Sequence, residues 1–269
     1  MKSEFDFLRN LKSKYHLNHI GDDCAVLPMN ESHDLLVTAD MLVEDVDFRL
    51  KWTTPEFLGH KSLAVSLSDV AAMGGTPTWA MVSIGLPDTL WKTDYLDRFY
   101  VGWHELAGIH NVELVGGDIS RTDATVVIDS VVGGEVGKDS AIKRSGAQIG
   151  NAIFVTGFLG GAAAGLDLLE SGERFESVES AITRHLILRQ LQPLPQVQTA
   201  NVLYEYDLAS SMLDISDGLS SDLSHLLDAS HVGALLVAEA IPIDPATAGF
   251  PQGEPLKMAL HGGEDYELL

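Results

Sequence analysis

Short acidic clusters recur along the sequence, and their side chains could bind a metal ion together with phosphate groups. The motif "GDD" ends at Asp23, just before an apolar run, and "VTAD" brings Asp40 near the hydroxyl of Thr38. The segment "SLSDVAAMGG" carries Asp69. Carboxylates and hydroxyls without accompanying cysteines or paired histidines are the oxygen ligands that Mg²⁺ prefers, and Mg²⁺ commonly bridges to substrate phosphates. These clusters together predict a magnesium–phosphate site.

Two more clusters follow the same pattern. "VGGD" ends a predicted strand at Gly116, Gly117 and Asp118, and "DISD" places Asp214 and Asp217 across a strand-to-helix turn. Taken singly, an aspartate at a strand end is usually a turn or cap residue. The joint pattern favours metal binding over a set of unrelated turns.

The segment "LDISDGLSSDL" admits three interpretations, namely a calcium loop, a helix cap or half of a metal site. Counted from Asp214, an EF-hand loop requires glycine at the sixth position and glutamate at the twelfth. The chain has Leu219 and His225 there, so the calcium interpretation fails. A helix that starts at Asp217–Gly218 would leave free N–H groups for an anion. An N-cap formed by Ser216 or Asp217 is compatible with metal binding.

Composition excludes several classes of protein. The 269 residues include 39 acidic and 17 basic residues, a net charge of −22, which argues against a nucleic-acid-binding surface. No apolar run approaches the roughly 18 to 20 residues that span a bilayer, and the N-terminus lacks the apolar core of a signal peptide. A single cysteine, Cys24, excludes an internal disulfide framework. We expect a cytoplasmic protein with no nucleic-acid or membrane partner.

The elements that must position these residues mix strands and helices in both halves, so we expect an α+β fold. The polar, glycine-dotted segment 137–151 predicts a boundary between two domains, 1–137 and 138–269. Predicted strands are 24–29, 34–42, 78–87, 112–117, 125–136, 152–157, 210–215 and 233–239, and predicted helices include 53–73, 94–110, 158–171, 177–191 and 217–230. "LHGGEDYELL" ends at Leu269 as an apolar strand begins, so we expect the C-terminal domain to be incomplete.

Several segments in this order resemble one family. "GDDCAV", "TADMLVEDVDF", "HKSLAVSLSDVAAMGGTPTWAMVSIGLP", "VGGDISR", "VTGFLGGAAAGL", "LDISDGLSSDL" and "GGEDYELL" resemble the thiamine-monophosphate kinases, within the aminoimidazole-ribonucleotide-synthetase (PurM-like) superfamily. The resemblance implies a two-domain PurM-like architecture, in which an N-terminal mixed sheet with helices binds ATP and Mg²⁺ and forms a homodimer. It also implies a C-terminal α+β domain that continues past the last motif.

The resemblance implies an enzyme that makes thiamine diphosphate from thiamine monophosphate and ATP. The phosphoryl group would pass directly and in line from ATP, assisted by several Mg²⁺ ions. The implied metal ligands are Asp23, Thr38, Ala39 through its backbone oxygen, Asp40, Asp69, Asp118, Asp214 and Asp217, with Asp118 and Asp214 also catalytic. The implied ATP contacts are Tyr100, Gly117, Asp118, Arg144 and Ser216, and the implied substrate contacts are Asp47 and Glu264. Family members often have a hydroxyl residue in place of Ala39 and histidine in place of Asp47.

Two alternatives remain at this point. The chain could be a paralogue that binds magnesium and nucleotide without catalysis, or another synthetase of the same superfamily. Selenophosphate synthetase requires a reactive cysteine or selenocysteine near the N-terminus beside a glycine-rich segment. Cys24 lies within the predicted strand after "GDD", so it matches that requirement poorly.

Overall fold

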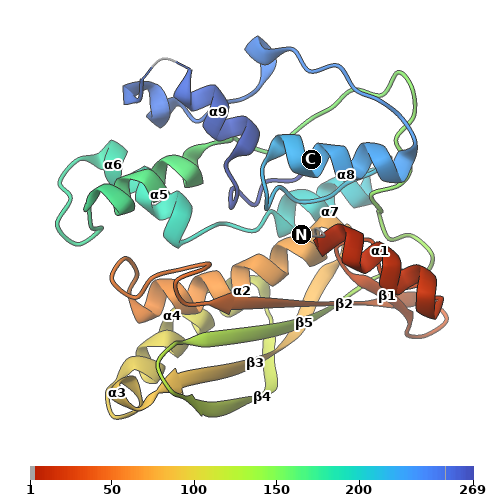
Figure 1. Ribbon diagram of the computed structural model, residues 1–269. Helices are drawn as coiled ribbons and strands as arrows, with labels where there is room; N and C mark the ends of the chain where they lie inside the picture. Colours follow the sequence, from red (N-terminus) through yellow and green to blue (C-terminus); the bar gives the residue numbers. More distant parts are fainter. Residues whose placement is uncertain (1–3, 252) are drawn as a thin grey trace.

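The computed structural model describes residues 4–251 and 253–269 and confirms the α+β class (Figure 1). The elements in chain order are α1 (Glu4–Tyr15), β1 (Ala25–Pro28), β2 (His33–Val43), α2 (Pro55–Ala72), β3 (Thr76–Pro87), α3 (Asp88–Trp91), α4 (Tyr95–His110), β4 (Glu113–Thr122), β5 (Val127–Gly137), α5 (Gly161–Ser171), α6 (Ala181–Leu191), α7 (Val197–Glu205), α8 (Leu219–Ser230), η1 (Ala238–Ala240), η2 (Pro245–Gly249) and α9 (Glu254–His261). None of the helices in these two ranges combines the length and the apolarity needed to cross a bilayer.

The strands form one mixed sheet in the order β1-β2-β5-β3-β4, in which only the β3–β4 pair is parallel. Side chains alternate between the two faces of a strand. In β2, Leu36 and Leu42 are buried against the helices, and Thr38 and Asp40 share their face. Met41 points to the opposite, open face and is 60% exposed. The sheet thus presents site residues from β2 toward the helical layer.

One of the predicted strand ends is wrong. Asp118 was expected to end its strand, but β4 runs on to Thr122. The strand predicted over 34–42, which contains Asp40, appears as β2 and continues to Val43. The polar residues do not terminate the strands because ladder pairing continues through them, from Asp40 opposite Ser130 to Val43 opposite Val127.

Helix α2 lies between the sheet and the C-terminal helices (Figure 1). The Thr54 side chain accepts a hydrogen bond from the N–H of Phe57, and Pro55 occupies the first turn, so both residues define the start of the helix. Buried residues occur on all sides of α2, as expected for a helix covered on both faces. This central position lets one helix contribute side chains to both halves of the protein.

Helices α2 and α4 cross at two glycines. A Cβ atom added to Gly59 would lie 1.9 Å from the carbonyl oxygen of Phe99, and one added to Gly102 would lie 1.9 Å from that of Glu56. Any side chain at either position would push the two backbones apart. The two glycines therefore allow the backbones of α2 and α4 to approach each other closely.

The C-terminal half contains helices, but the predicted strands 152–157, 210–215 and 233–239 are not regular strands in the structure. Backbone hydrogen bonds join 213–216 to 264–269, for example from Ile215 N to Glu267 O at 2.8 Å. Thr156 N adds one bond to Leu268 O at 3.1 Å. The pairing is too short to form a ladder, and a single bridge between Asp214 and Leu268 is its only strand-like pair in the described ranges.

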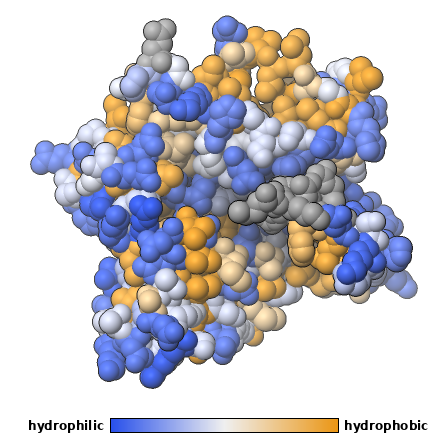
Figure 2. Space-filling view, viewed as in Figure 1, coloured by the Kyte–Doolittle hydropathy of each residue, from blue (hydrophilic) through white to orange (hydrophobic). Residues whose placement is uncertain are grey.

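A broad groove of about 1260 Å³ lies between 147–156, α8 and 232–242. Its surroundings expose Ile149, Phe154 and Leu235, at 95%, 77% and 88%. Figure 2 shows apolar surface interrupting the hydrophilic exterior at the top of the view. Segments 152–157 and 233–239, which form no regular strands, contribute Phe154 and Leu235 to this exposed apolar surface.

Candidate functional site

Three aspartates from distant parts of the chain meet beside α2. Carboxylate oxygens of Asp23, Asp69 and Asp214 lie within 4.8 Å of one another. Asp23 precedes β1, Asp69 lies in the last turns of α2, and Asp214 belongs to the segment before α8. Asp40 adjoins the group, since its charge acts on Asp69. The structure therefore brings together four of the predicted metal ligands.

Hydroxyl groups hold these carboxylates in place. Thr38 Oγ1 donates to Asp69 Oδ2 at 2.5 Å, and Ser66 Oγ donates to Asp40 Oδ2 at 2.6 Å. Ser68 Oγ donates to Asp214 Oδ2, also at 2.6 Å. Thr38, one of the predicted metal ligands, therefore holds another predicted ligand, Asp69, through its hydroxyl.

Arg144 supplies the positive charge nearest to the cluster. Its Nη2 lies 2.5 Å from Asp23 Oδ1, and its backbone N–H donates to Asp22 Oδ1 at 3.0 Å. The Asp23 side chain is 1% exposed and the Arg144 side chain 21%. The predicted ATP contact at Arg144 thus stands beside the acidic cluster.

Crowding of like charges in a buried place makes the carboxylates hard to ionise. Burial raises the pKa of Asp69 and of Asp214 well above the ordinary value, and neighbouring aspartates raise both further. The pKa of Asp23 is raised by burial, although Arg144 opposes the shift. Burial raises the pKa of Asp40 as well. A bound cation would relieve all of these shifts together.

The donor set fits a hard divalent cation. Every side-chain donor of the cluster is an oxygen, and carboxylates dominate. Asp23 Oδ2 is buried and has no hydrogen-bond partner among the described residues. A buried carboxylate oxygen without a partner is unfavourable, and a metal ion would satisfy it.

The turn before α8 differs from the prediction. The helix begins after Gly218, which has no side-chain cap, so neither Ser216 nor Asp217 is the N-cap. The N–H groups of Asp217 and Gly218 both donate to Asp222 Oδ2 at 3.0 Å, and so they are not free for an anion. Burial raises the pKa of Asp222 to about 7. The Asp217 side chain is exposed and lies outside the three-aspartate group.

Asp118 lies on the opposite side of the sheet from the cluster. Residues paired across neighbouring strands point to the same face of a sheet. Asp118 pairs with Ser83, Ser83 pairs with Asp129, and Asp129 pairs with Met41 on the open face. Three strand spacings of about 4.8 Å separate Asp118 from β2, a total of about 14 Å. Asp118 is exposed there, so one copy of the chain does not bring it to the aspartate group.

The remaining predicted residues are dispersed. Ala39 is exposed on the open face of β2, and Gly117 adopts a φ of +146° in β4. Tyr100 lies on α4, edge-on to Phe99. Asp47 Oδ2 accepts a hydrogen bond of 2.8 Å from Val43 N, which stabilises the loop after β2. None of these contacts reaches the three-aspartate group.

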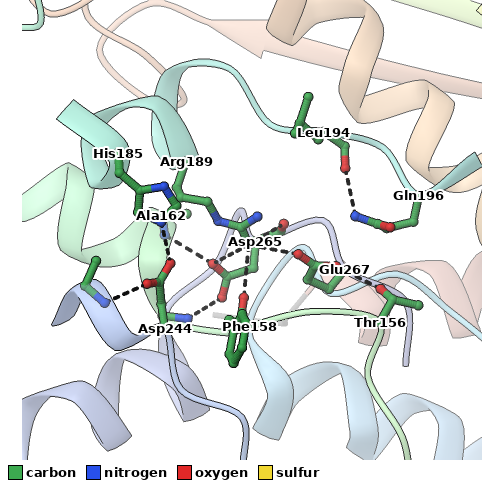
Figure 3. Close-up of polar contacts among 12 residues, drawn as sticks. Thr156, Phe158, Ala162, His185, Arg189, Leu194, Gln196, Asp244, Asp265 and Glu267 are labelled. Carbon is green, nitrogen blue, oxygen red and sulfur yellow. Dashed lines mark hydrogen bonds and ion pairs between the residues drawn. The ribbon is translucent and has the colours of Figure 1, made fainter. Parts of the chain in front are cut away.

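Glu264 lies in a loop packed against the "DISDG" turn, where its N–H donates to Ser216 O at 2.8 Å. Neighbours of Glu264 anchor this loop (Figure 3). Asp265 accepts from the N–H groups of Gly160 and Ala162 at 2.6 and 3.1 Å. Arg189 Nη2 lies 3.1 Å from Glu267 Oε1. The predicted substrate contact therefore sits on a fixed backbone next to the site.

Sequence reasoning assigned no role in the site to four supporting residues, namely Lys61, Ser66, Ser68 and Asp222. Both serines of "SLSD" come just before Asp69 in the sequence, and helical spacing places Ser66 and Lys61 on its face, but neither signal names a partner. The partners of the two serines lie 26 and 146 residues away, so only the folded chain shows which carboxylate each one binds.

Comparison with known proteins identifies relatives over nearly the whole chain. Residues 21–136 match the family described as "AIR synthase related protein, N-terminal domain". Thiamine-monophosphate kinase of Bacillus subtilis (strain 168) is 36% identical over 275 residues, covering 98% of this chain and 82% of that protein. The thiamine-monophosphate kinase of Escherichia coli (strain K12) is 38% identical over 265 residues, covering 98% of this chain and 78% of that protein.

Solved structures agree with the sequence relatives. One described as "AaThiL complexed with AMPPCP and TMP" has a TM-score of 0.90 at 33% identity and covers 100% of this chain and 85% of that one. Thiamine monophosphate kinase from Aquifex aeolicus has a TM-score of 0.86 at 33% identity, covering 99% and 86%. By sequence and by fold, this chain belongs to the thiamine-monophosphate kinase family.

Proposed function

We propose that the protein transfers the terminal phosphoryl group of ATP to thiamine monophosphate, giving thiamine diphosphate and ADP. The observation that carries this proposal is the meeting of Asp23, Asp69 and Asp214 within 4.8 Å in a chain of this family. A relative of the same fold has been solved with AMPPCP and TMP. Both substrates of the proposed reaction carry anionic phosphate groups, so an acidic cluster can bind those groups only through cations.

Asp23, Asp40, Asp69 and Asp214 would hold Mg²⁺, and we propose that Asp217, Thr38 and the backbone oxygen of Ala39 assist from nearby. Bound Mg²⁺ would neutralise the phosphates and align them for transfer. Among the chain's own groups, Arg144 and Ser216 would contact ATP phosphates, and Glu264 and Asp47 would orient the thiamine part. Tyr100 and Gly117 would contact the nucleotide.

No strong general base is needed for this transfer. A phosphate monoester has a second pKa near 6, so the attacking oxygen is largely ionised at neutral pH. That oxygen forms a bond to the γ-phosphorus of ATP while the bond from the γ-phosphorus to the bridging β-oxygen breaks, and ADP leaves with the electron pair. We therefore propose direct transfer without a phosphoenzyme. A labelled covalent phosphoprotein isolated during turnover would contradict it.

Asp118 would join the reaction from the open face of the sheet if two copies pair through their N-terminal domains, residues 1–137. The uncovered side chains there support this proposal, since Met41 is 60% and Met81 40% exposed. Residues 138–269 would form the second domain. We also propose that the enzyme acts in the cytoplasm. A monomer in size-exclusion chromatography at working concentrations would contradict the dimer.

The test is an assay of ATP-dependent thiamine diphosphate formation by this chain beside its Bacillus subtilis relative. Asp214→Asn and Asp118→Asn variants that still fold should lose turnover. Full activity in both variants would contradict the assignment of these residues as metal ligands. If the chain binds Mg–ATP without turnover while the relative turns over, the non-catalytic alternative is correct.

A further inference from the structure

Lys61 is a buried lysine whose charge points at Glu264. The residue is 3% exposed on α2, and its Nζ lies 2.5 Å from Glu264 Oε2. Lysine is almost never fully buried unless it is paired. The pair joins two segments 203 residues apart, one in the central helix and one in the loop beside the "DISDG" turn.

Gln190 completes a clamp on the same oxygen. Its Nε2 donates to Glu264 Oε2, and Lys61 Nζ also donates to the backbone oxygen of Gln190 at 3.3 Å. Lys61 and Gln190 therefore both donate to Oε2 of Glu264, and they are also joined to each other by a hydrogen bond. The Glu264 side chain nevertheless keeps 25% of its surface exposed, and both of these donors bind the same oxygen, Oε2.

The backbone under Glu264 is held just as firmly. Glu264 adopts φ +68° and Tyr266 adopts φ +50°, conformations that non-glycine residues keep only when their surroundings enforce them. Arg189 and two N–H groups at the start of α5 anchor Asp265 and Glu267 on the loop (Figure 3). Arg189 and Gln190 are adjacent on α6, so one helix fixes both the loop and the carboxylate.

We propose that Lys61, with Gln190, is a positioning residue that binds one oxygen of Glu264 so that the other faces the substrate. The free oxygen would accept a hydrogen bond from the aminopyrimidine of thiamine monophosphate. In the clamp, the negative charge of Glu264 also compensates the positive charge of Lys61. The lysine would therefore not repel the positively charged thiazolium. This inference rests on the proposed function and extends it to a residue that touches neither phosphate nor metal.

The test measures binding of thiamine monophosphate by calorimetry, together with KM and kcat for each substrate. Lys61→Met should raise the Kd and KM for thiamine monophosphate about tenfold, with the KM for ATP changed less than about twofold. Lys61→Arg keeps the charge and should retain most of the affinity. Because Lys61 acts through Glu264, Lys61→Met should add nothing in a Glu264→Gln background.

Lys138→Met is the matched control, because Lys138 Nζ lies 2.5 Å from Asp34 Oδ1 in an ion pair outside the site. It should leave substrate affinity unchanged. If Lys61→Met does not fold, Gln190→Leu tests the same clamp and should also raise the Kd. Unchanged affinity in a folded clamp variant, or additive effects in the double variant, would overturn the inference. A parent chain that neither binds nor converts thiamine monophosphate would overturn the proposed function itself.

Discussion

Ser68 and Asp214 are joined by a buried hydrogen bond of 2.6 Å across 146 residues of sequence. Ser68 is fully buried and Asp214 is 4% exposed. The bond favours the charged form of a carboxylate whose pKa is raised by burial and by neighbouring aspartates. The bond also joins the central helix α2 to the segment that precedes α8. The position of Asp214 in the site therefore depends on how the two halves pack together.

Removing this donor should destabilise the protein. Ser68→Ala leaves a buried carboxylate oxygen without its partner, so the free energy of unfolding should fall by about 1–3 kcal/mol. Urea titration measures it. Ser171→Ala is the control, because the exposed Ser171 bonds only to the Leu168 carbonyl oxygen and should change stability by less than about 0.5 kcal/mol. Equal effects of the two substitutions would contradict the role of Ser68.

Asp222 should make the metal-free protein less stable as the pH rises. Its pKa is raised from 3.8 to about 7 in the folded state, so the folded protein binds more protons than the unfolded chain between these values. The stability contribution of this group therefore declines from about pH 4 to about pH 7 and stays low above that.

Asp222→Asn should remove this pH dependence, because the amide oxygen still accepts from Asp217 and Gly218 but does not titrate. Relative to the parent, the variant should gain stability at pH 8, with about 4 kcal/mol as an upper bound, and little near pH 4. Urea unfolding in EDTA across this range checks it. An equal loss of stability at both ends would show that the carboxylate is not the titrating group.

Arg144 should matter most when no metal is bound. Arg144→Gln removes the partner of buried Asp23, which should lower the free energy of unfolding in EDTA by about 3 kcal/mol. MgCl₂ should restore part of the loss, because the cation compensates the same carboxylate. Thermal unfolding with and without MgCl₂ measures both effects.

Arg98→Gln is the control for Arg144. It breaks a surface pair with Glu56, whose side chains are 45% and 34% exposed, and it should cost about 0–1 kcal/mol regardless of MgCl₂. If the loss in Arg144→Gln is also independent of MgCl₂, Arg144 and the metal do not share Asp23.

The crossing of α2 and α4 should not tolerate a methyl group. Gly59→Ala places Cβ 1.9 Å from the Phe99 carbonyl oxygen, and the resulting separation of the helices should destabilise the protein by about 3 kcal/mol or more. At Gly108 on the same α4 a Cβ meets nothing within 4 Å, so Gly108→Ala should stabilise by about 0.5–1 kcal/mol. Urea unfolding separates the two, and a neutral Gly59→Ala would contradict the close crossing.

Local patterns predicted the long helices and most N-terminal strands well. The helix over 94–110 appears as Tyr95–His110, and the strand over 125–136 appears as Val127–Gly137. In the C-terminal half, apolar runs such as 152–157 and 233–239 predicted strands that the structure does not form. An apolar run becomes a strand only when a neighbour provides a ladder, and sequence alone cannot show that neighbour.

Residue types and their spacing were enough to indicate oxygen ligands for a hard cation and the α+β class, because these depend on side-chain chemistry and on local periodicity. The family was indicated by the resemblance of seven motifs in their order along the chain. The meeting of Asp23, Asp69 and Asp214 depended on the tertiary structure, because it joins segments up to 191 residues apart (214 − 23). The register of the sheet likewise placed Asp118 on the face opposite Asp40, since a strand's pairing decides where each side chain points. Only the packing of α2 between the two halves decided which hydroxyl and which lysine hold which carboxylate.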